Sequence, residues 1–226
     1  MRTWLYKVLL SFPLILGWNA SAESCELALV FAVDVSGSVD NEEFTTQMRG
    51  LAEGLRDPEV VDALVNGQAS LMVVQWTGAS RQDVLVPWVS IGDRAALASF
   101  ADATENAPRR WRNFSTAIGE ALQFSATQFS DAPVCTRRVI DISGDGSSNE
   151  GVDPNDTREL LNDLHIVVNA LVIEGAEENI VEYFHKNVIS GGGSFVITAN
   201  SYEEYPEKMR LKLLREISKQ VASIID

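Results

Sequence analysis

The fold of this chain is decided by the apolar run Leu27-Ala-Leu-Val-Phe-Ala-Val33 and by the polar loop that follows it, Asp34-Val35-Ser36-Gly37-Ser38. A run this apolar predicts a strand covered on both faces of a sheet. The loop places one carboxylate and two hydroxyls at alternate positions, and oxygen donors at such spacing can converge on one hard divalent cation. Because hydroxyls coordinate without adding negative charge, a metal bound here would keep much of its positive charge for another ligand.

Short apolar runs alternate with helical patterns along the rest of the chain, which is typical of an α/β fold with a mostly parallel sheet. The further strand candidates are 69–76, 83–89, 138–143, 166–173 and 194–198. The gap at 77–82 is too short for a crossover helix, so we expect a hairpin there and an antiparallel edge strand after it. Helices are expected around 44–55 and 118–129, and from about 206 to 225.

The first 22 residues have the pattern of a secretory signal peptide. Arg2 and Lys7 precede an apolar run at 8–17, and Ala20-Ser21-Ala22 is a small-residue cleavage signal. The run is about half the roughly 20 residues that a membrane-spanning helix needs. We therefore expect export, cleavage after Ala22 and no membrane insertion afterwards. With 226 residues, of which 46% are hydrophobic, the chain predicts one domain at 23–226.

The chain is acidic, with a formal net charge of −14. Residues 1–22 contain two basic residues and no acidic ones, so their removal leaves a net charge of −16. A surface this acidic argues against nucleic acid and anionic membranes as partners. Five basic residues on the last predicted helix look like a solvated face: Lys208, Arg210, Lys212, Arg215 and Lys219.

Two later positions match the first polar loop. Thr116 opens the helix Thr-Ala-Ile-Gly-Glu-Ala-Leu, and Asp145-Gly146 follows the strand at 138–143 almost directly. Together Asp34, Ser36, Ser38, Thr116 and Asp145 resemble the metal-ion-dependent adhesion site of the von Willebrand factor type A family. The resemblance covers essentially the whole chain after residue 22, with its elements in order. It is strongest to exported bacterial members, which implies a periplasmic or secreted bacterial protein.

The resemblance implies a doubly wound, six-stranded sheet in the order 3-2-1-4-5-6, with helices on both faces. The first and fourth strands are then neighbours at the switch point where open α/β sheets bind ligands. It also implies that Ser36, Ser38 and Thr116 bind the metal, usually Mg²⁺, with Mn²⁺ or Ca²⁺ as alternatives. The two aspartates would bind it directly or through water. An open metal position would then accept a carboxylate of a partner protein, without catalysis. Gly144 stands where most relatives carry Thr, which predicts a looser loop before Asp145.

Two alternatives use the same residues. One is a metal-dependent hydrolase or phosphotransferase with Asp34 as nucleophile or base, and the other is a metal site that is purely structural. The chain has no Gly-x-Gly-x-x-Gly after its first strand, no phosphate-loop signature and no Gly-x-Ser-x-Gly elbow. We expect His165 and His185 to be structural.

The loop Pro108-Arg109-Arg110-Trp111-Arg112-Asn113 puts three Arg and a Trp just ahead of Thr116 in an acidic protein. One interpretation is local charge balance, with Trp111 packed on the surface. The other is a recognition rim beside the metal, because Arg and Trp are favoured at binding hot spots. On the second interpretation Arg109, Arg110, Trp111 and Arg112 contact the partner.

The chain contains two cysteines, Cys25 and Cys135. Cys25 lies nine residues before Asp34, and Cys135 lies ten before Asp145. If those aspartates mark the same ends of neighbouring parallel strands, the cysteines meet at the opposite ends, within the roughly 4.4–6.8 Å Cα separation of a disulfide. Export to an oxidising compartment favours this bridge over two separate buried thiols.

Overall fold

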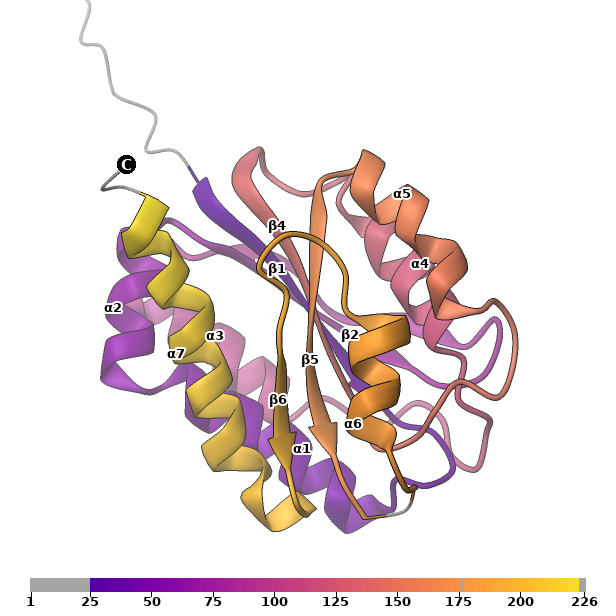
Figure 1. Ribbon diagram of the computed structural model, residues 1–226. Coiled ribbons are helices and arrows are strands. Elements are labelled where there is room, and N and C mark those ends of the chain that lie inside the picture. The colour runs from indigo at the N-terminus through magenta and orange to yellow at the C-terminus, as the bar shows by residue number, and fades with distance from the viewer. Residues whose placement is uncertain (1–24, 176, 224–226) are drawn as a thin grey trace, which may run out of the picture.

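The computed structural model describes residues 25–175 and 177–223, and the predicted signal peptide lies outside them. A six-stranded sheet in the order β3-β2-β1-β4-β5-β6 runs through the molecule (Figure 1). The strands are β1 (Cys25–Asp34), β2 (Ser70–Trp76), β3 (Gln82–Ser90), β4 (Cys135–Gly144), β5 (Ile166–Ile173) and β6 (Val196–Ala199). All neighbours pair in parallel except β2 and β3. The predicted strands, their order and the antiparallel edge are therefore confirmed.

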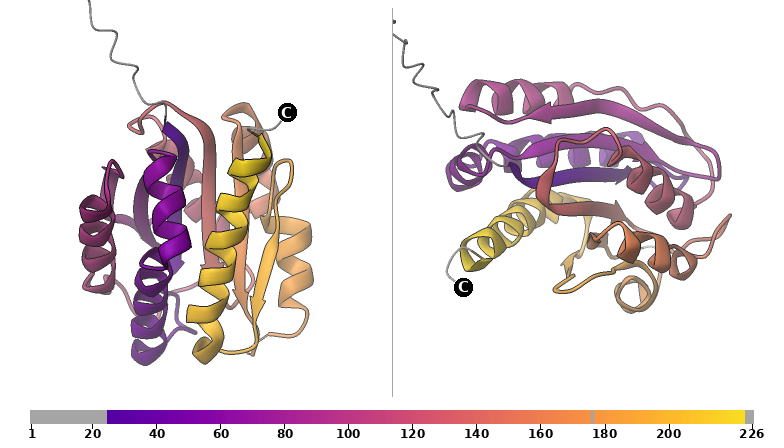
Figure 2. Two further views of the ribbon diagram at one scale, coloured as in Figure 1. Left: turned by 90° about the vertical axis from the view of Figure 1, so that its left-hand side faces the viewer. Right: turned by 90° about the horizontal axis from the view of Figure 1, so that it is seen from above.

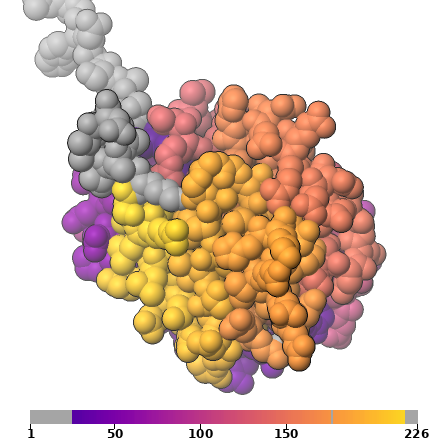
Figure 3. Space-filling view, in the orientation of Figure 1, coloured from indigo at the N-terminus to yellow at the C-terminus, as the bar shows by residue number. Residues whose placement is uncertain are grey.

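Helices cover both faces of the sheet (Figure 2). One face packs against α1 (Asn41–Leu55), α2 (Pro58–Asn66), α3 (Arg94–Glu105) and α7 (Tyr205–Ser223). The other packs against α4 (Ile118–Gln128), α5 (Arg158–Asp163) and α6 (Ile180–Tyr183). The short turns η1 (Pro154–Thr157), η2 (Phe184–Val188) and η3 (Tyr202–Glu204) connect these elements. Figure 3 shows the surface on the side of α7, β6 and α6.

Strand β1 is buried on both faces, as its composition predicts. Leu27, Leu29 and Phe31 enter the core beneath α1, α3 and α7, whereas Ala28 and Val30 enter the core beneath α4 and α6. Successive side chains of a strand point to opposite faces, so one apolar run supplies both cores. The strand that ends in Asp34 is therefore rigidly held from both sides.

The helix after the polar loop begins at a strong start signal. The Asp40 side chain accepts from the backbone N–H of Glu43, and the Glu43 side chain accepts from the N–H of Asp40. This reciprocal capping box satisfies backbone donors that would otherwise lack partners at a helix start. It fixes the beginning of α1 at Asn41, only three residues after Ser38.

The predicted disulfide is present at the end of the sheet opposite Asp34. Cys25 pairs with Cys135 in the β1–β4 register, with 4.5 Å between their Cα atoms. The bridge closes a loop with a sequence separation of 110 and contributes on the order of 2–4 kcal/mol to stability.

The prediction that the basic residues of α7 form a solvated face is wrong for Lys212. Its side chain is fully buried against the sheet and forms an ion pair with Asp141 of β4. One helical turn later Glu216 forms an ion pair with Arg137 and accepts a hydrogen bond from Asn169. Arg210 pairs with Asp57 and Lys208 with Glu204 nearer the surface, while the side chain of Lys219 lies outside the described part.

Candidate metal site at the switch point

The five predicted ligands come from three loops at the carboxyl ends of β1 and β4. Asp34 ends β1, Ser36 and Ser38 lie in the loop before α1, and Asp145 follows β4 directly. Thr116 lies two residues before α4. Because β1 and β4 are parallel neighbours, the chain leaves them at the same edge of the sheet, which is where open α/β sheets form ligand crevices.

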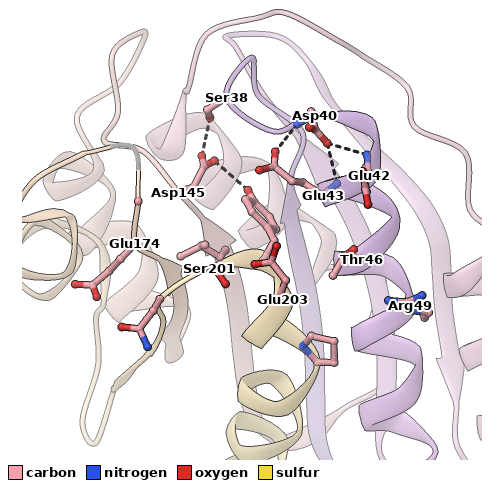
Figure 4. Close-up of a pocket in the computed structure, with 15 residues that line it drawn as sticks. Ser38, Asp40, Glu42, Glu43, Thr46, Arg49, Asp145, Glu174, Ser201 and Glu203 are labelled. Carbon is pink, nitrogen blue, oxygen red and sulfur yellow. Dashed lines mark hydrogen bonds between the residues drawn. The ribbon is translucent and has the colours of Figure 1, made fainter.

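Hydrogen bonds join these side chains directly. The Ser36 and Ser38 hydroxyl oxygens lie 3.2 Å apart, and the Ser38 hydroxyl donates to Asp145 Oδ1 at 2.6 Å (Figure 4). The backbone N–H of Ser36 donates to Asp34 Oδ1 at 2.7 Å. The structure thus brings Asp34, Ser36, Ser38 and Asp145 into one connected cluster.

The second carboxylate oxygen of Asp34, Oδ2, is buried and has no hydrogen-bond partner among the described residues. Burial, followed by the charge of Asp145, raises the pKa of Asp34 to about 8. In the described part of the chain, no Lys or Arg forms an ion pair with either aspartate. The charge of Arg109 lowers the pKa of Asp34, but burial and the charge of Asp145 outweigh it, so this cluster carries a deficit of positive charge.

Thr116 is placed beside the cluster by hydrogen bonds of its own backbone. Its N–H donates to the Asn149 side chain at 3.0 Å, and its carbonyl accepts from the N–H of Asn149 at 2.9 Å. Thr116 lines a crevice of about 370 Å³ together with Ser38, Asp145 and Gly146. The loop after β4 therefore holds the predicted threonine against the predicted aspartate.

Gly144 does not loosen the loop, contrary to the expectation from its sequence. It is the last residue of β4 and pairs with Val172 of β5, so the strand stays regular up to Asp145. A Cβ at this position would lie 3.2 Å from Asp34 Oδ2 and 3.3 Å from the Phe184 ring. The glycine thus leaves room for the Asp34 carboxylate.

Tyr202 is a site residue that the sequence pattern did not identify. It precedes α7, and its hydroxyl donates to Asp145 Oδ2 at 3.0 Å. Burial and the charge of Asp145 raise the pKa of Tyr202, so the phenol stays a neutral donor. Tyr202 belongs to no motif of the other elements, and only the fold brings it to Asp145.

An open cleft of about 740 Å³ adjoins the cluster and shares Ser38 and Asp145 with it (Figure 4). Besides Asp145 and one basic residue, Arg49, five carboxylates line this cleft: Asp40, Glu42, Glu43, Glu174 and Glu203. The opposite side of the cluster has a different character. There the exposed Phe114 ring lies 4.0 Å from the Arg81 guanidinium carbon and lines the crevice beside Thr116.

The four residues of the basic loop have different surroundings. Arg109 donates hydrogen bonds to backbone carbonyls of the β1–α1 loop, and Arg110 forms an ion pair with Asp83 of β3. Trp111 packs against the core, and Arg112 is exposed. Local contacts thus account for the positions of Trp111 and of the buried part of Arg109. The Arg112 side chain, in contrast, faces solvent.

The donor set fits a hard cation. Among the described residues, no three His, Cys, Asp or Glu side chains come together as metal ligands. The carboxylates of Asp34 and Asp145 nevertheless form one cluster with the hydroxyls of two serines, and Thr116 lines the crevice beside it. Oxygen ligands of this kind suit Mg²⁺ or Mn²⁺. A divalent cation would also supply the charge that Asp34 lacks.

Asp34 and Ser36 are fully buried members of the cluster. Both residues are 0% exposed. His165 precedes β5 at the opposite end of the sheet.

Solved structures show which fold this is. Proximal thread matrix protein 1 from the mussel byssus superposes with a TM-score of 0.65 and 19% sequence identity, over 84% of this chain and 47% of that one. Another structure of that protein has a zinc-occupied metal-ion-dependent adhesion motif, with a TM-score of 0.59, 20% identity and coverage of 84% and 48%.

Two bacterial structures agree with this. The pilus adhesin SpaC from Lactobacillus rhamnosus GG gives a TM-score of 0.62 and 14% identity over 86% of this chain and 30% of the adhesin. A von Willebrand factor type A protein from Catenulispora acidiphila gives a TM-score of 0.56 and 18% sequence identity, over 83% of this chain and 42% of that one. This chain spans less than half the length of each of these proteins.

The fold is therefore that of von Willebrand factor type A domains. The structure described between residues 25 and 223 contains no helix long and apolar enough to cross a membrane. No curated protein matches the chain in sequence. A family model described as "Protein of unknown function (DUF1194)" matches residues 24–221, and the chain belongs to that family.

Proposed function

We propose that this chain is an exported protein-binding module of the adhesion type that works through a bound divalent cation and performs no catalysis. Asp34, Ser36, Ser38, Thr116 and Asp145 would hold Mg²⁺, with Mn²⁺ or Ca²⁺ as alternatives. The observation that carries the proposal is Asp34 Oδ2, a buried carboxylate oxygen without a hydrogen-bond partner in the described structure, next to a second carboxylate. A cation at this point would stabilise both charges.

The arrangement suits a metal that still binds a further ligand. Two carboxylates neutralise a divalent ion, and the three hydroxyls add no charge, so one more anionic ligand is tolerated. The crevice beside Thr116 and Asp145 offers room for such a group. We infer that a partner protein presents a carboxylate there.

The charges around the crevice favour one direction of approach. The cleft lined by Asp40, Glu43 and Glu203 would repel an acidic partner, because like charges brought together oppose association. The crevice beside Thr116 is lined by fewer carboxylates, Asp145 and Glu177, and the Arg81 guanidinium over the Phe114 ring would attract an acidic group to it. On this model Arg110 and Arg112 guide the partner, and Trp111 supports their loop.

Export is part of the proposal. The Cys25–Cys135 disulfide is typical of oxidising compartments, and the matrix and pilus proteins with this fold agree with a role outside the cytosol. We therefore propose cleavage of a signal peptide at residues 1–22 and a single domain at 23–226, in the periplasm or secreted from a bacterium. Nucleic acid and membranes are not proposed as partners.

Calorimetry with Mg²⁺ and Mn²⁺ tests the metal. We expect one site in the wild type, and its loss in Asp34→Ala and Thr116→Ala. Asp131→Ala is the matched control, because Asp131 is exposed and lies before β4, at the other end of the sheet. Equal metal binding by all four proteins would contradict the proposal.

Affinity capture from a native envelope tests the partner. Capture with Mg²⁺ should succeed and capture with chelator should fail. The double variant Arg110→Ser, Arg112→Ser should weaken capture and reduce its dependence on salt, since rim charges act chiefly on the association rate. Capture that is unchanged in this variant, with metal binding intact, would remove the basic loop from the recognition surface.

A further inference from the structure

Arg109 binds the backbone of the loop that carries two of the proposed metal ligands. Its Nη2 atom donates to the carbonyl oxygens of Val35 and Ser36, both at 3.2 Å, and of Val39 at 2.6 Å. Its Nη1 atom donates to the Asp40 carbonyl at 2.8 Å. One guanidinium therefore contacts four of the six carbonyls between Val35 and Asp40.

A guanidinium is suited to this task. It carries five N–H donors in a rigid planar fork, whereas a lysine ammonium offers three donors on a flexible stem. The loop turns sharply between a strand and a helix, and of the four carbonyls only those of Ser36 and Asp40 are also seen to accept a backbone N–H from the described residues. Within the loop, the backbone N–H of Val39 donates to the Ser36 carbonyl at 3.2 Å, which closes one turn.

Arg109 is itself held in place from the sheet. Gln75 of β2 is fully buried, and its amide donates to the Pro108 carbonyl at 3.1 Å and accepts from the Arg110 N–H at 2.9 Å. The Arg109 Nε donates to the Trp111 carbonyl at 2.8 Å. The loop that carries Arg109 is thus anchored on both sides of this residue to strand β2.

We propose that Arg109 is a positioning residue of the metal site. Its fork holds the β1–α1 loop so that the Ser36 and Ser38 hydroxyls stay 3.2 Å apart and aligned with Asp145. Metal affinity therefore depends on the fork geometry of Arg109. This inference rests on the proposed function, because it concerns the affinity of the proposed site.

A geometric role and a purely electrostatic role of Arg109 predict opposite changes in metal affinity when the residue is replaced. A positive charge near a cation opposes its binding, so removal of the charge alone would strengthen metal binding. Loss of the fork would weaken it, because the ligands would no longer be ordered before the metal arrives. Arg109→Lys keeps the charge and loses the fork, and Arg109→Met loses both.

The experiment measures Mn²⁺ affinity by calorimetry, and backbone hydrogen exchange in chelator, for the wild type, Arg109→Lys and Arg109→Met. Arg94→Lys and Arg94→Met are the matched controls. Arg94 is exposed, pairs with Asp62 and begins α3 at the other end of the sheet. We expect both Arg109 variants to lose roughly 10–100-fold in Mn²⁺ affinity, the range for residues that orient metal ligands. Exchange should become faster at residues 35–40 and stay unchanged in the central strands.

Three results would overturn the inference: wild-type affinity in both Arg109 variants, tighter binding by Arg109→Met with no change in Arg109→Lys, or a lower melting temperature with unchanged affinity. If Arg109→Met does not fold, the Mn²⁺ affinity of Arg109→Lys tests the inference alone, because this variant keeps the charge and most of the aliphatic stem. A wild type that binds no metal would instead refute the proposed function. In that case the hydrogen exchange still shows whether the fork orders the loop.

Discussion

Strand β4 contributes a carboxylate to each of two buried clusters, and the two clusters differ in what neutralises them. Asp141 faces α7, where the chain supplies Lys212 as its counter-charge and Arg137 as that of Glu216. Asp145, four residues later, meets Asp34, and there the chain supplies hydroxyls and a phenol. Both clusters hold two carboxylates, but only the first has cationic side chains paired with them in the described structure.

This difference indicates that the cluster under α7 stabilises the fold, whereas the cluster at the switch point is a candidate functional site. The partners of a buried ion pair neutralise each other's charge, and removing one of them is strongly destabilising. A cluster that leaves a buried carboxylate oxygen without a partner costs stability, and such costs are typical of functional sites. On the proposed function, the cluster at the switch point takes a cation from solvent, whereas the cluster under α7 already contains its cationic partners.

The largest expected effect is the loss of Lys212. Lys212→Met removes the ammonium that faces the buried Asp141 carboxylate, which should lower the free energy of unfolding by about 3–5 kcal/mol. Urea denaturation measures this. The double variant Lys212→Met, Asp141→Leu should recover most of the loss, because no buried charge is then left behind. A single variant as stable as the wild type would show that the α7 cluster is not held by its charges.

Removal of the disulfide should have the second largest effect. Cys25→Ala, Cys135→Ala frees a long loop in the unfolded state and should cost about 2–4 kcal/mol. The bridge lies at the end of the sheet opposite the metal site, so Mn²⁺ affinity should stay unchanged in the same protein. A drop in affinity that matches the drop in stability would mean that the two ends of β1 and β4 are coupled.

The smallest expected effect is a pH dependence of stability without metal. Burial and the charge of Asp145 raise the pKa of Asp34 to about 8 in the folded protein, from an ordinary value of 3.8. The protonated form is thus favoured by folding, and this contribution is complete at low pH and lost as the pH rises toward 8. Water entering the adjacent crevice should moderate the loss.

Unfolding in chelator at pH 5 and pH 8 measures this effect. The wild type should be less stable at pH 8, the Asp34→Asn variant should show a weaker dependence, and Mn²⁺ should restore the wild type at pH 8. The same pH dependence in the wild type and in Asp34→Asn would assign the titration to another group.

Features that depend on local pattern were predictable from the sequence. The six strands follow from apolar runs, and the β1–β4 adjacency that joins Cys25 to Cys135 follows from the resemblance in topology. Asp34, Ser36 and Ser38 stand at alternate positions of one short loop, so their spacing in the sequence predicted that they lie close together. Thr116 and Asp145 were found because each adjoins a recognisable element.

Other features depend on contacts between distant segments, and spacing does not reveal those. Arg109 and Tyr202 lie 75 and 168 residues after Asp34, the last residue of β1, and neither belongs to a motif that predicts its hydrogen-bond acceptor. Lys212 was expected in solvent because Lys is rarely buried without a partner. Its partner, Asp141, is 71 residues away, and only the packing of α7 on the sheet pairs them.

The most direct test of the central claim is the anomalous difference map of a crystal grown with Mn²⁺. The account predicts one strong peak between the carboxylates of Asp34 and Asp145 and the hydroxyls of Ser36, Ser38 and Thr116, and none beside Asp141 and Glu216. A Mn²⁺-bound crystal whose peak lies in the acidic cleft at Glu43 and Glu203, with none at the switch point, would contradict it.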